Sequence, residues 1–170
     1  MIKNLPTIDE ELITKLREAS ENRGTWFYFL LKAAHDKGYD IEKFARKGIR
    51  EVGHSRHPQY PDTDDLKVFL DSFMGEIDKK LFEMELVSFD GTEAKIDFHY
   101  CPMCGAWTKL TDDQKFIEKI CDIAMDVDRG LFDTFENFEF SLGKTICQGH
   151  DTCEIYIKKV NKGKTEEKNV

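Results

Sequence analysis

Four of the five cysteines lie in two short segments, CPMCG at residues 101–105 and ICQGHDTC at residues 146–153. The pattern Cys-Pro-x-Cys-Gly at the end of a strand is typical of zinc-binding knuckles, because proline fixes the turn and glycine lets backbone N–H groups approach the sulfurs. A closed tetrahedral site needs two further ligands. The candidates for these positions are Cys147, His150 and Cys153 in the second segment.

The residues alone leave three interpretations of these cysteines open. In the first, a thiolate attacks an electrophilic carbon of a substrate. In the second, thiolates bind a zinc ion or an iron–sulfur cluster. In the third, the cysteines fill the core as small apolar side chains, which is the more usual role for Cys121. The set for metal binding is Cys101, Cys104, Cys147 and Cys153, with His150 as a further candidate.

A single carboxylate interrupts an apolar row on the long helix predicted over residues 111–135. Apolar residues stand before and after Asp128 at intervals of three and four. Because burial of a lone carboxylate is costly, Asp128 should have hydrogen-bond partners or a raised pKa. It is either a general acid or base in a pocket, or a residue that orders a loop. The row consists of Ile117, Cys121, Ala124, Asp128, Leu131 and Phe135.

The elements that must position these residues change their period halfway along the chain. Apolar spacing of three and four residues predicts helices over 7–19, 25–38, 40–53 and 63–75. Alternation predicts strands over 81–89, 93–101, 138–142 and 153–159, the first two joined by a turn at Asp90-Gly91. This order, helices and then β-β-α-β-β, predicts an α+β fold with a helical N-terminal half packed on an antiparallel sheet of about four strands. The face that Cys153 shares with Ile155 and Ile157 should point into the core.

Composition and charge restrict the class of protein. The length of 170 residues predicts one domain over residues 1–160, followed by a disordered tail over 161–170. A net charge of −8 argues against nucleic acid as a partner, because phosphate binding needs a basic face. No long apolar run and no signal peptide are visible, so we expect no membrane partner and a cytoplasmic location. Cysteines stay reduced in the cytoplasm, which favours metal binding or catalysis over disulfides.

Three segments of the second half resemble one bacterial family. They are YCPMCGAW, ICDIAMDVDRG and GKTICQGHDTCEIYI. Together they are similar to the L-2-amino-thiazoline-4-carboxylic acid hydrolase family, in which a cysteine follows a strand and a helix carries a cysteine and an aspartate. A threonine then precedes a turn with glycine and cysteine that leads into the last strand. The matching residues are Cys101, Trp107, Cys121, Asp128, Thr145, Gly149 and Cys153. There is a fainter likeness to the small-molecule-binding domains named after vinyl reductase, which are related to a vesicle-tethering subunit fold.

The resemblance implies a hydrolase that opens a small cyclic amidine or isothiourea at a C–N or C–S bond, with no required cofactor. Cys101 or Cys153 would attack the amidine-like carbon, and Asp128 would bind the amidinium or transfer protons. Arg129 is a candidate partner for the carboxylate of the substrate. The residues implied in substrate binding are Trp107, Thr145 and Gly149.

The sequence departs from the family pattern at three positions. His150 stands where an acidic residue often follows the glycine, and neither Cys104 nor Cys147 is a general feature of the family. The two extra cysteines favour a metal-binding or ligand-sensing domain, whereas Asp128 in its apolar row favours a hydrolase. The hydrolase interpretation ranks first, mainly on the resemblance. Any shared site requires that the two cysteine segments meet in the fold.

Overall fold

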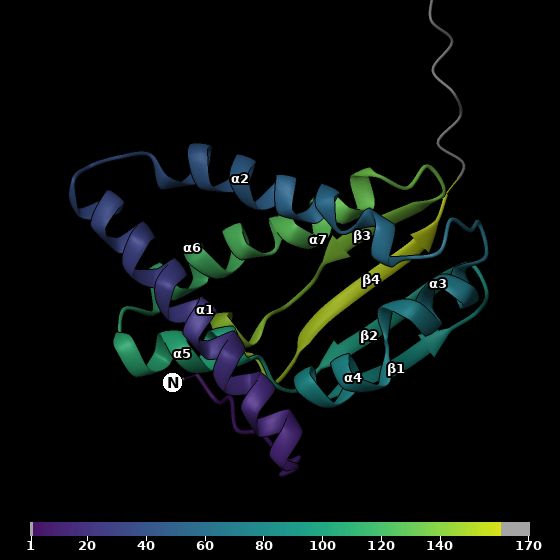
Figure 1. Cartoon of the computed structure of the whole chain (residues 1–170), viewed down its shortest axis with the longest axis horizontal. Helices are drawn as coiled ribbons and strands as arrows, with labels where there is room; N and C mark the ends of the chain where they lie inside the picture. Colours follow the sequence, from purple (N-terminus) through teal and green to yellow (C-terminus); the bar gives the residue numbers. More distant parts are fainter. Residues whose placement is uncertain (1, 161–170) are drawn as a thin grey trace, which may run out of the picture.

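The computed structural model describes residues 2–160, which build an antiparallel sheet of four strands with helices beside it (Figure 1). The strands β1 (Met84–Phe89), β2 (Glu93–Phe98), β3 (Phe138–Leu142) and β4 (Cys153–Lys159) lie in the order β1-β2-β4-β3. β1 and β2 form the predicted hairpin, in which Gly91 has a φ of 91°. The fold class is α+β, as predicted. The predicted disordered tail lies outside the described residues.

One face of the sheet carries part of the core. In the ladder between β2 and β4, Ile96 lies opposite Ile155, and Ala94 lies opposite Ile157. All four side chains are buried, and Cys153 is buried on the same face. Successive residues of a strand point to opposite faces, so the alternation in the sequence determines which face is covered. The prediction that Cys153, Ile155 and Ile157 point into the core is confirmed.

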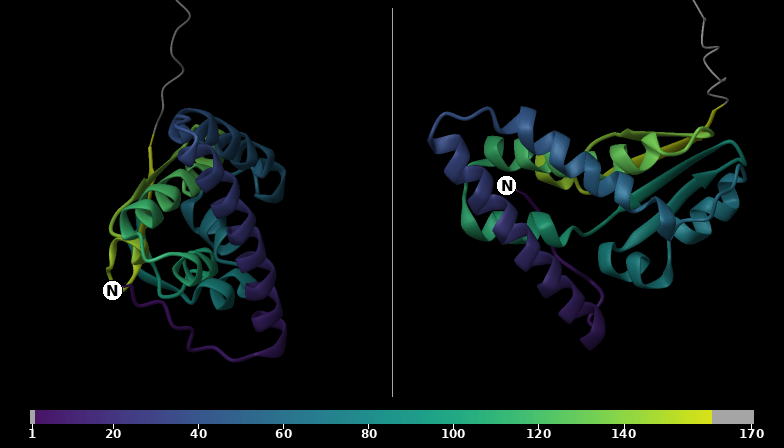
Figure 2. Two further views of the ribbon diagram at one scale, coloured as in Figure 1. Left: turned by 90° about the vertical axis from the view of Figure 1, so that its left-hand side faces the viewer. Right: turned by 45° about the horizontal axis from the view of Figure 1, so that its top comes forward.

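The N-terminal half is helical, as predicted, and consists of α1 (Glu11–Asp36), α2 (Ile41–Ser55), α3 (Leu66–Phe73) and α4 (Glu76–Phe82). α1 and α2 form the two arms of a V (Figures 1 and 2). The two helices predicted over 7–19 and 25–38 are one continuous helix, and Gly24 between them lies where α1 meets α5. A Cβ atom on Gly24 would come within 3.2 Å of the Ala106 side chain. Within residues 2–160, no helix is both long and apolar enough to cross a membrane.

Two predictions for the second half are wrong. The CPMCG segment is not a knuckle: it begins α5 (Pro102–Leu110), with Cys101 as the N-cap and proline at the first helical position. The long helix predicted over 111–135 is two helices, α6 (Gln114–Ala124) and α7 (Asp126–Asp133), which meet at Met125. The break places Asp126 and Asp128 in the first turn of α7, where the helix dipole favours carboxylates.

α2 and α7 touch through their backbones. A Cβ atom on Gly53 of α2 would lie 2.2 Å from the Val127 carbonyl oxygen. A Cβ atom on Gly130 of α7 would lie 2.2 Å from the Arg50 carbonyl oxygen. Only glycine fits at these two positions, so this close crossing is set by the sequence. It fixes where α7 holds its acidic residues.

The segment before α1 is tied down at two places. The Asn4 side chain binds the backbone of Cys101. Further along, the Glu83 carboxylate accepts hydrogen bonds from the backbone N–H groups of Thr7 and Ile8 and forms a buried ion pair of 2.9 Å with Arg17. Both attachments connect the N-terminal segment to the region where the sheet leads into α5.

Candidate active site

Cys101 lies at the junction between β2 and α5. Asn4 holds its backbone from both sides: the side chain of Asn4 accepts the Cys101 N–H at 2.9 Å and donates to the Cys101 carbonyl at 2.8 Å. The thiol is half-buried, and burial raises its pKa well above the ordinary value. The backbone N–H of Cys104 lowers the pKa of Cys101, as expected at a helix N-terminus, but this effect is smaller than that of burial. The residue is therefore partly exposed, while its thiol is held in the protonated form at neutral pH.

The two cysteine segments meet in one core cluster, and Cys121 of α6 lies between them. The thiols of Cys104 and Cys121 lie near the thiol of Cys147, and their interaction with it raises its pKa. The sulfur of Cys153 accepts the backbone N–H of Ile146 at 3.3 Å, and burial raises its pKa to about 12. All five cysteines thus lie together, which the sequence left open.

The residues predicted to bind substrate lie beside this cluster in structural positions. Trp107 is fully buried, and its indole N–H donates to the Gly24 carbonyl at 2.9 Å, so it joins α5 to α1. Thr145 is buried and caps the short helix η2 (Ile146–Gln148), and Gly149 ends that helix with a φ of 90°. His150 follows on the surface. Thr145 and Gly149 shape the short helix that carries Cys147, and direct contact of these residues with a substrate stays a prediction.

Asp128 is the unusual carboxylate of the site. It is half-buried, and within residues 2–160 its side chain forms no hydrogen bond and no ion pair. Burial raises its pKa to about 6, while the charges of Arg56 and Arg129 act in the opposite direction. Of the two alternatives that the sequence predicted, hydrogen-bond partners or a raised pKa, the structure has the raised pKa. A carboxylate with this pKa exchanges its proton near neutral pH.

Arg56 lies near Asp128, and Arg23 lies near Cys101; the sequence analysis missed both arginines. Neither guanidinium forms a hydrogen bond or an ion pair with another described residue. The positive charge of Arg56 lowers the pKa of Asp128 and the pKa of Arg23. Burial also lowers the pKa of Arg23, whereas the nearby Cys101 raises it by a smaller amount. Arg56 follows α2 in a loop without periodic pattern, so no sequence signal could have identified it.

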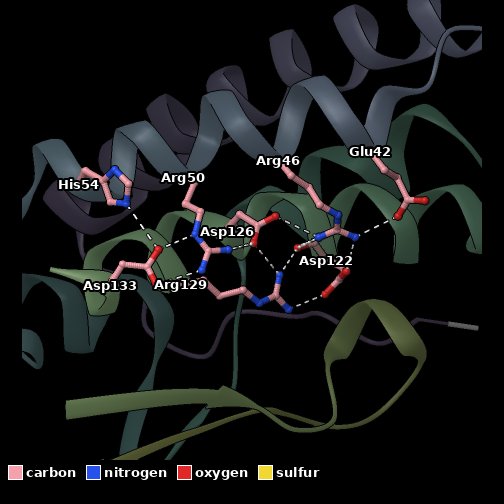
Figure 3. Close-up of polar contacts among 8 residues, drawn as sticks. All are labelled: Glu42, Arg46, Arg50, His54, Asp122, Asp126, Arg129 and Asp133. Carbon is pink, nitrogen blue, oxygen red and sulfur yellow. Dashed lines mark hydrogen bonds and ion pairs between the residues drawn. The ribbon is translucent and has the colours of Figure 1, made fainter. Parts of the chain in front are cut away.

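The predicted carboxylate partner, Arg129, is already engaged (Figure 3). Its guanidinium donates to Asp122 at 2.6 Å and to Asp126 at 3.2 Å. Asp126 is buried and also accepts from Arg46 of α2 at 3.0 Å. This network spans the interface of α2 with α6 and α7, and its geometry makes Arg129 a residue that fixes α7. A surface pocket of about 270 Å³ lies beside it, with Arg129 in its wall.

The structure has no preformed metal site among residues 2–160. Within residues 2–160, which include all five cysteines, no group of three or more His, Cys, Asp or Glu side chains is placed to hold a metal ion. Zinc and iron–sulfur clusters bind thiolates, whereas burial and mutual contact favour the neutral thiols here. Binding of either group stays a prediction.

Comparisons with known proteins agree with this fold. A model of the L-2-amino-thiazoline-4-carboxylic acid hydrolase family matches residues 20–157. No curated protein matches the chain. One similar solved structure is a trafficking protein particle complex subunit 3 from Naegleria fowleri, covalently bound to palmitic acid. It is 16% identical with a TM-score of 0.59, covers 84% of this chain and 95% of its own, and shows similarity of fold alone. Because the family match spans most of the sequence, the chain belongs to the L-2-amino-thiazoline-4-carboxylic acid hydrolase family.

Proposed function

We propose that the protein is a thiol-dependent hydrolase that opens a small cyclic amidine or isothiourea bearing a carboxylate. One observation carries this proposal: Asp128 and Arg56 are near each other, yet within residues 2–160 neither side chain has a hydrogen-bonding or ion-pair partner. Unpaired charges in a half-buried region are costly unless a ligand engages them. A substrate amidinium is suited to Asp128, and a substrate carboxylate is suited to Arg56, since both pairs can form two parallel hydrogen bonds.

Cys101 supplies the nucleophile in this proposal. It is half-buried at a helix N-terminus, whereas Cys153 is buried and its sulfur already accepts a backbone hydrogen bond. The raised pKa of Cys101 suits a thiol that ionises only when substrate is present. A bound amidinium places a positive charge beside the sulfur, which favours the thiolate.

The reaction has two stages. The Cys101 thiolate adds to the amidine carbon, and the ring C–S or C–N bond breaks while the leaving atom takes up a proton. Asp128 is suited to deliver that proton because its pKa is about 6. Water then adds to the carbon of the sulfur-linked adduct and expels the Cys101 sulfur. The open-chain product from an isothiourea carries a urea and a free thiol if the ring C–S bond broke, or a thiocarbamate and a free amine if the ring C–N bond broke. The cysteine recovers its proton from the same step.

The experiment is turnover of 2-amino-thiazoline-4-carboxylate, of the same ring without the carboxylate, and of the oxygen analogue, followed by mass spectrometry of the product. We expect turnover of the carboxylate-bearing compounds and a loss of at least ~10³-fold in Cys101→Ser. A larger loss in Cys153→Ser would move the nucleophile to that residue. Turnover of none of the three compounds, or full turnover in both variants, contradicts the proposal.

The contact of Cys147 with Cys104 and Cys121 favours a second candidate function, a ligand-sensing domain that binds zinc or an iron–sulfur cluster. It requires these thiols to ionise and rearrange around the metal. Metal content and the visible absorption spectrum of protein purified without oxygen test it. One equivalent of metal, lost when Cys104 and Cys147 are replaced, would favour this function over the hydrolase.

A further inference from the structure

Cys101 and Cys104 occupy the N-cap and the third position of α5. A pair of cysteines separated by two residues at the start of a helix is the arrangement of dithiols that exchange with disulfides. The first sulfur must be reachable from solvent, and the second must be shielded but close. Here Cys101 is half-buried, and Cys104 is 0% exposed.

The surroundings suit this division of roles. The backbone N–H of Cys104 is near enough to the Cys101 sulfur to lower its pKa. The two residues therefore lie close together in the first helical turn. The helix dipole favours negative charge on the first sulfur during attack, whereas burial raises the pKa of the Cys101 thiol, so exchange should become faster as pH rises. Asn4 holds the Cys101 N–H and carbonyl, which keeps the N-cap geometry fixed while the side chains turn.

The other three cysteines do not offer an equivalent point of entry. Cys121, Cys147 and Cys153 are all buried, with exposures of 7%, 1% and 9%. All five cysteines lie within the described residues. Among these five, Cys101 is partly exposed and the other four are buried. A disulfide in solution would therefore meet Cys101 first.

We propose that Cys101 and Cys104 form a redox-active dithiol that exchanges with low-molecular-weight disulfides. The Cys101 thiolate attacks one sulfur of the disulfide, a bond forms between these two sulfurs, and one thiol leaves. The Cys104 thiolate then attacks the Cys101 sulfur, closes the internal disulfide and releases the second thiol. The pair loses two protons and two electrons, and the external disulfide gains both.

This activity goes beyond the proposed hydrolysis and does not depend on it. It has one consequence for that site, because the closed disulfide removes the Cys101 thiol from hydrolytic chemistry. The two proposals therefore make separate predictions, one about the mass of the protein and one about turnover.

The test treats the reduced protein with oxidised glutathione, alkylates the remaining thiols under denaturing conditions, and counts the labels by mass spectrometry. The wild type should fall from five labelled cysteines to three, with Cys101 and Cys104 linked in the peptide map. Cys104→Ala should stop at one glutathione on Cys101, and Cys101→Ala should keep its remaining thiols. Cys121→Ala, from the same cluster, is the matched control and should still close the disulfide.

Several results would overturn the proposal. These are no internal disulfide in the wild type, closure that survives Cys104→Ala, or a map that links Cys101 to Cys153. Each readout is a mass, so inactivity toward every cyclic substrate leaves this test unaffected. Circular dichroism of each variant before oxidation shows whether a missing disulfide reflects a missing fold.

Discussion

The guanidinium of Arg56 lies close enough to the carboxylate of Asp128 to lower its pKa, yet the two form neither a hydrogen bond nor an ion pair. Two residues earlier on α7, Asp126 accepts hydrogen bonds from Arg46 and Arg129 and is buried (Figure 3). The same first turn thus holds one carboxylate engaged within the protein and one that is left available. This contrast separates a structural acid from a candidate functional one.

Asp128→Asn should stabilise the protein at neutral pH and abolish its proposed activity. The pKa is about 6 in the fold against 3.8 ordinarily, so the native state binds this proton more tightly than the unfolded chain. Between about pH 4 and 6, the free energy of unfolding of the wild type therefore falls as pH rises, relative to the variant. Because one pKa unit corresponds to about 1.4 kcal/mol, the gain at pH 7 should be at most about 3 kcal/mol. Urea denaturation at pH 4 and pH 7 measures it.

Asp126→Asn is the matched control, with the opposite sign. Removing this charge takes away the buried one of the two carboxylates that Arg46 and Arg129 share, and should destabilise the fold by about 3 kcal/mol. If both variants lose stability at pH 7, then Asp128 has a favourable partner in the fold and is not held available for a ligand.

Arg56→Gln should weaken substrate binding while the fold is retained. The side chain has no hydrogen bond to lose within residues 2–160, so thermal stability should change little. A charged hydrogen bond to a substrate carboxylate is worth about 1.5–3 kcal/mol, which predicts a KM raised roughly 10- to 100-fold. The pKa of Asp128 should also rise further, which would move the pH profile of kcat upward. Lys47→Gln removes the same charge from an exposed position of α2 and should leave KM unchanged.

The crossing of α2 and α7 predicts opposite effects for two glycines of one helix. Gly53→Ala places a methyl group 2.2 Å from the Val127 carbonyl oxygen, which forces the helices apart and should cost about 1–3 kcal/mol. Gly48→Ala meets nothing within 4 Å and should stabilise α2 by about 0.5–1 kcal/mol. Thermal melts of both variants distinguish them, and equal effects would contradict the close backbone contact.

The sequence predicted those features that depend on local period. The hairpin at Asp90-Gly91, the four strands and the buried face of β4 follow from alternation, and each is found in the structure. The position of Asp128 in an otherwise apolar row was also visible. These patterns involve residues that are close in sequence, so they can be recognised without knowing which elements pack against one another.

The features that the sequence did not predict depend on contacts between distant residues. Proline after Cys101 suits both a zinc knuckle and the first turn of a helix, and only the packing of α5 against α1 decides between them. The five cysteines come together only because α5, α6, η2 and β4 pack against one another. Arg56 is identified by what it fails to contact, which no sequence pattern reports.

Glu83→Gln should destabilise the protein far more than Glu10→Gln, although both residues pair with a cation. Burial raises the pKa of Glu83, but hydrogen bonds from Ile8, Thr7 and Arg17 outweigh this and lower it overall. Loss of its charge leaves the buried Arg17 unpaired and should cost about 3–5 kcal/mol. Glu10 meets Lys80 on the surface at 2.8 Å, where solvent screens the ion pair, so Glu10→Gln should change the stability little.

The pH dependence of the Glu83 contribution gives this prediction a second measurement. The folded pKa is lowered, so the stabilisation is complete above the unfolded value of about 4.5 and is lost as pH falls through the folded value. The difference between wild type and Glu83→Gln in denaturant unfolding should therefore shrink below pH 4. Because Glu83 anchors the backbone of Thr7 and Ile8, the variant should also release the segment that carries Asn4. Hydrogen exchange should then quicken at the Cys101 N–H, and unchanged exchange would show that Asn4 holds Cys101 without help from Glu83.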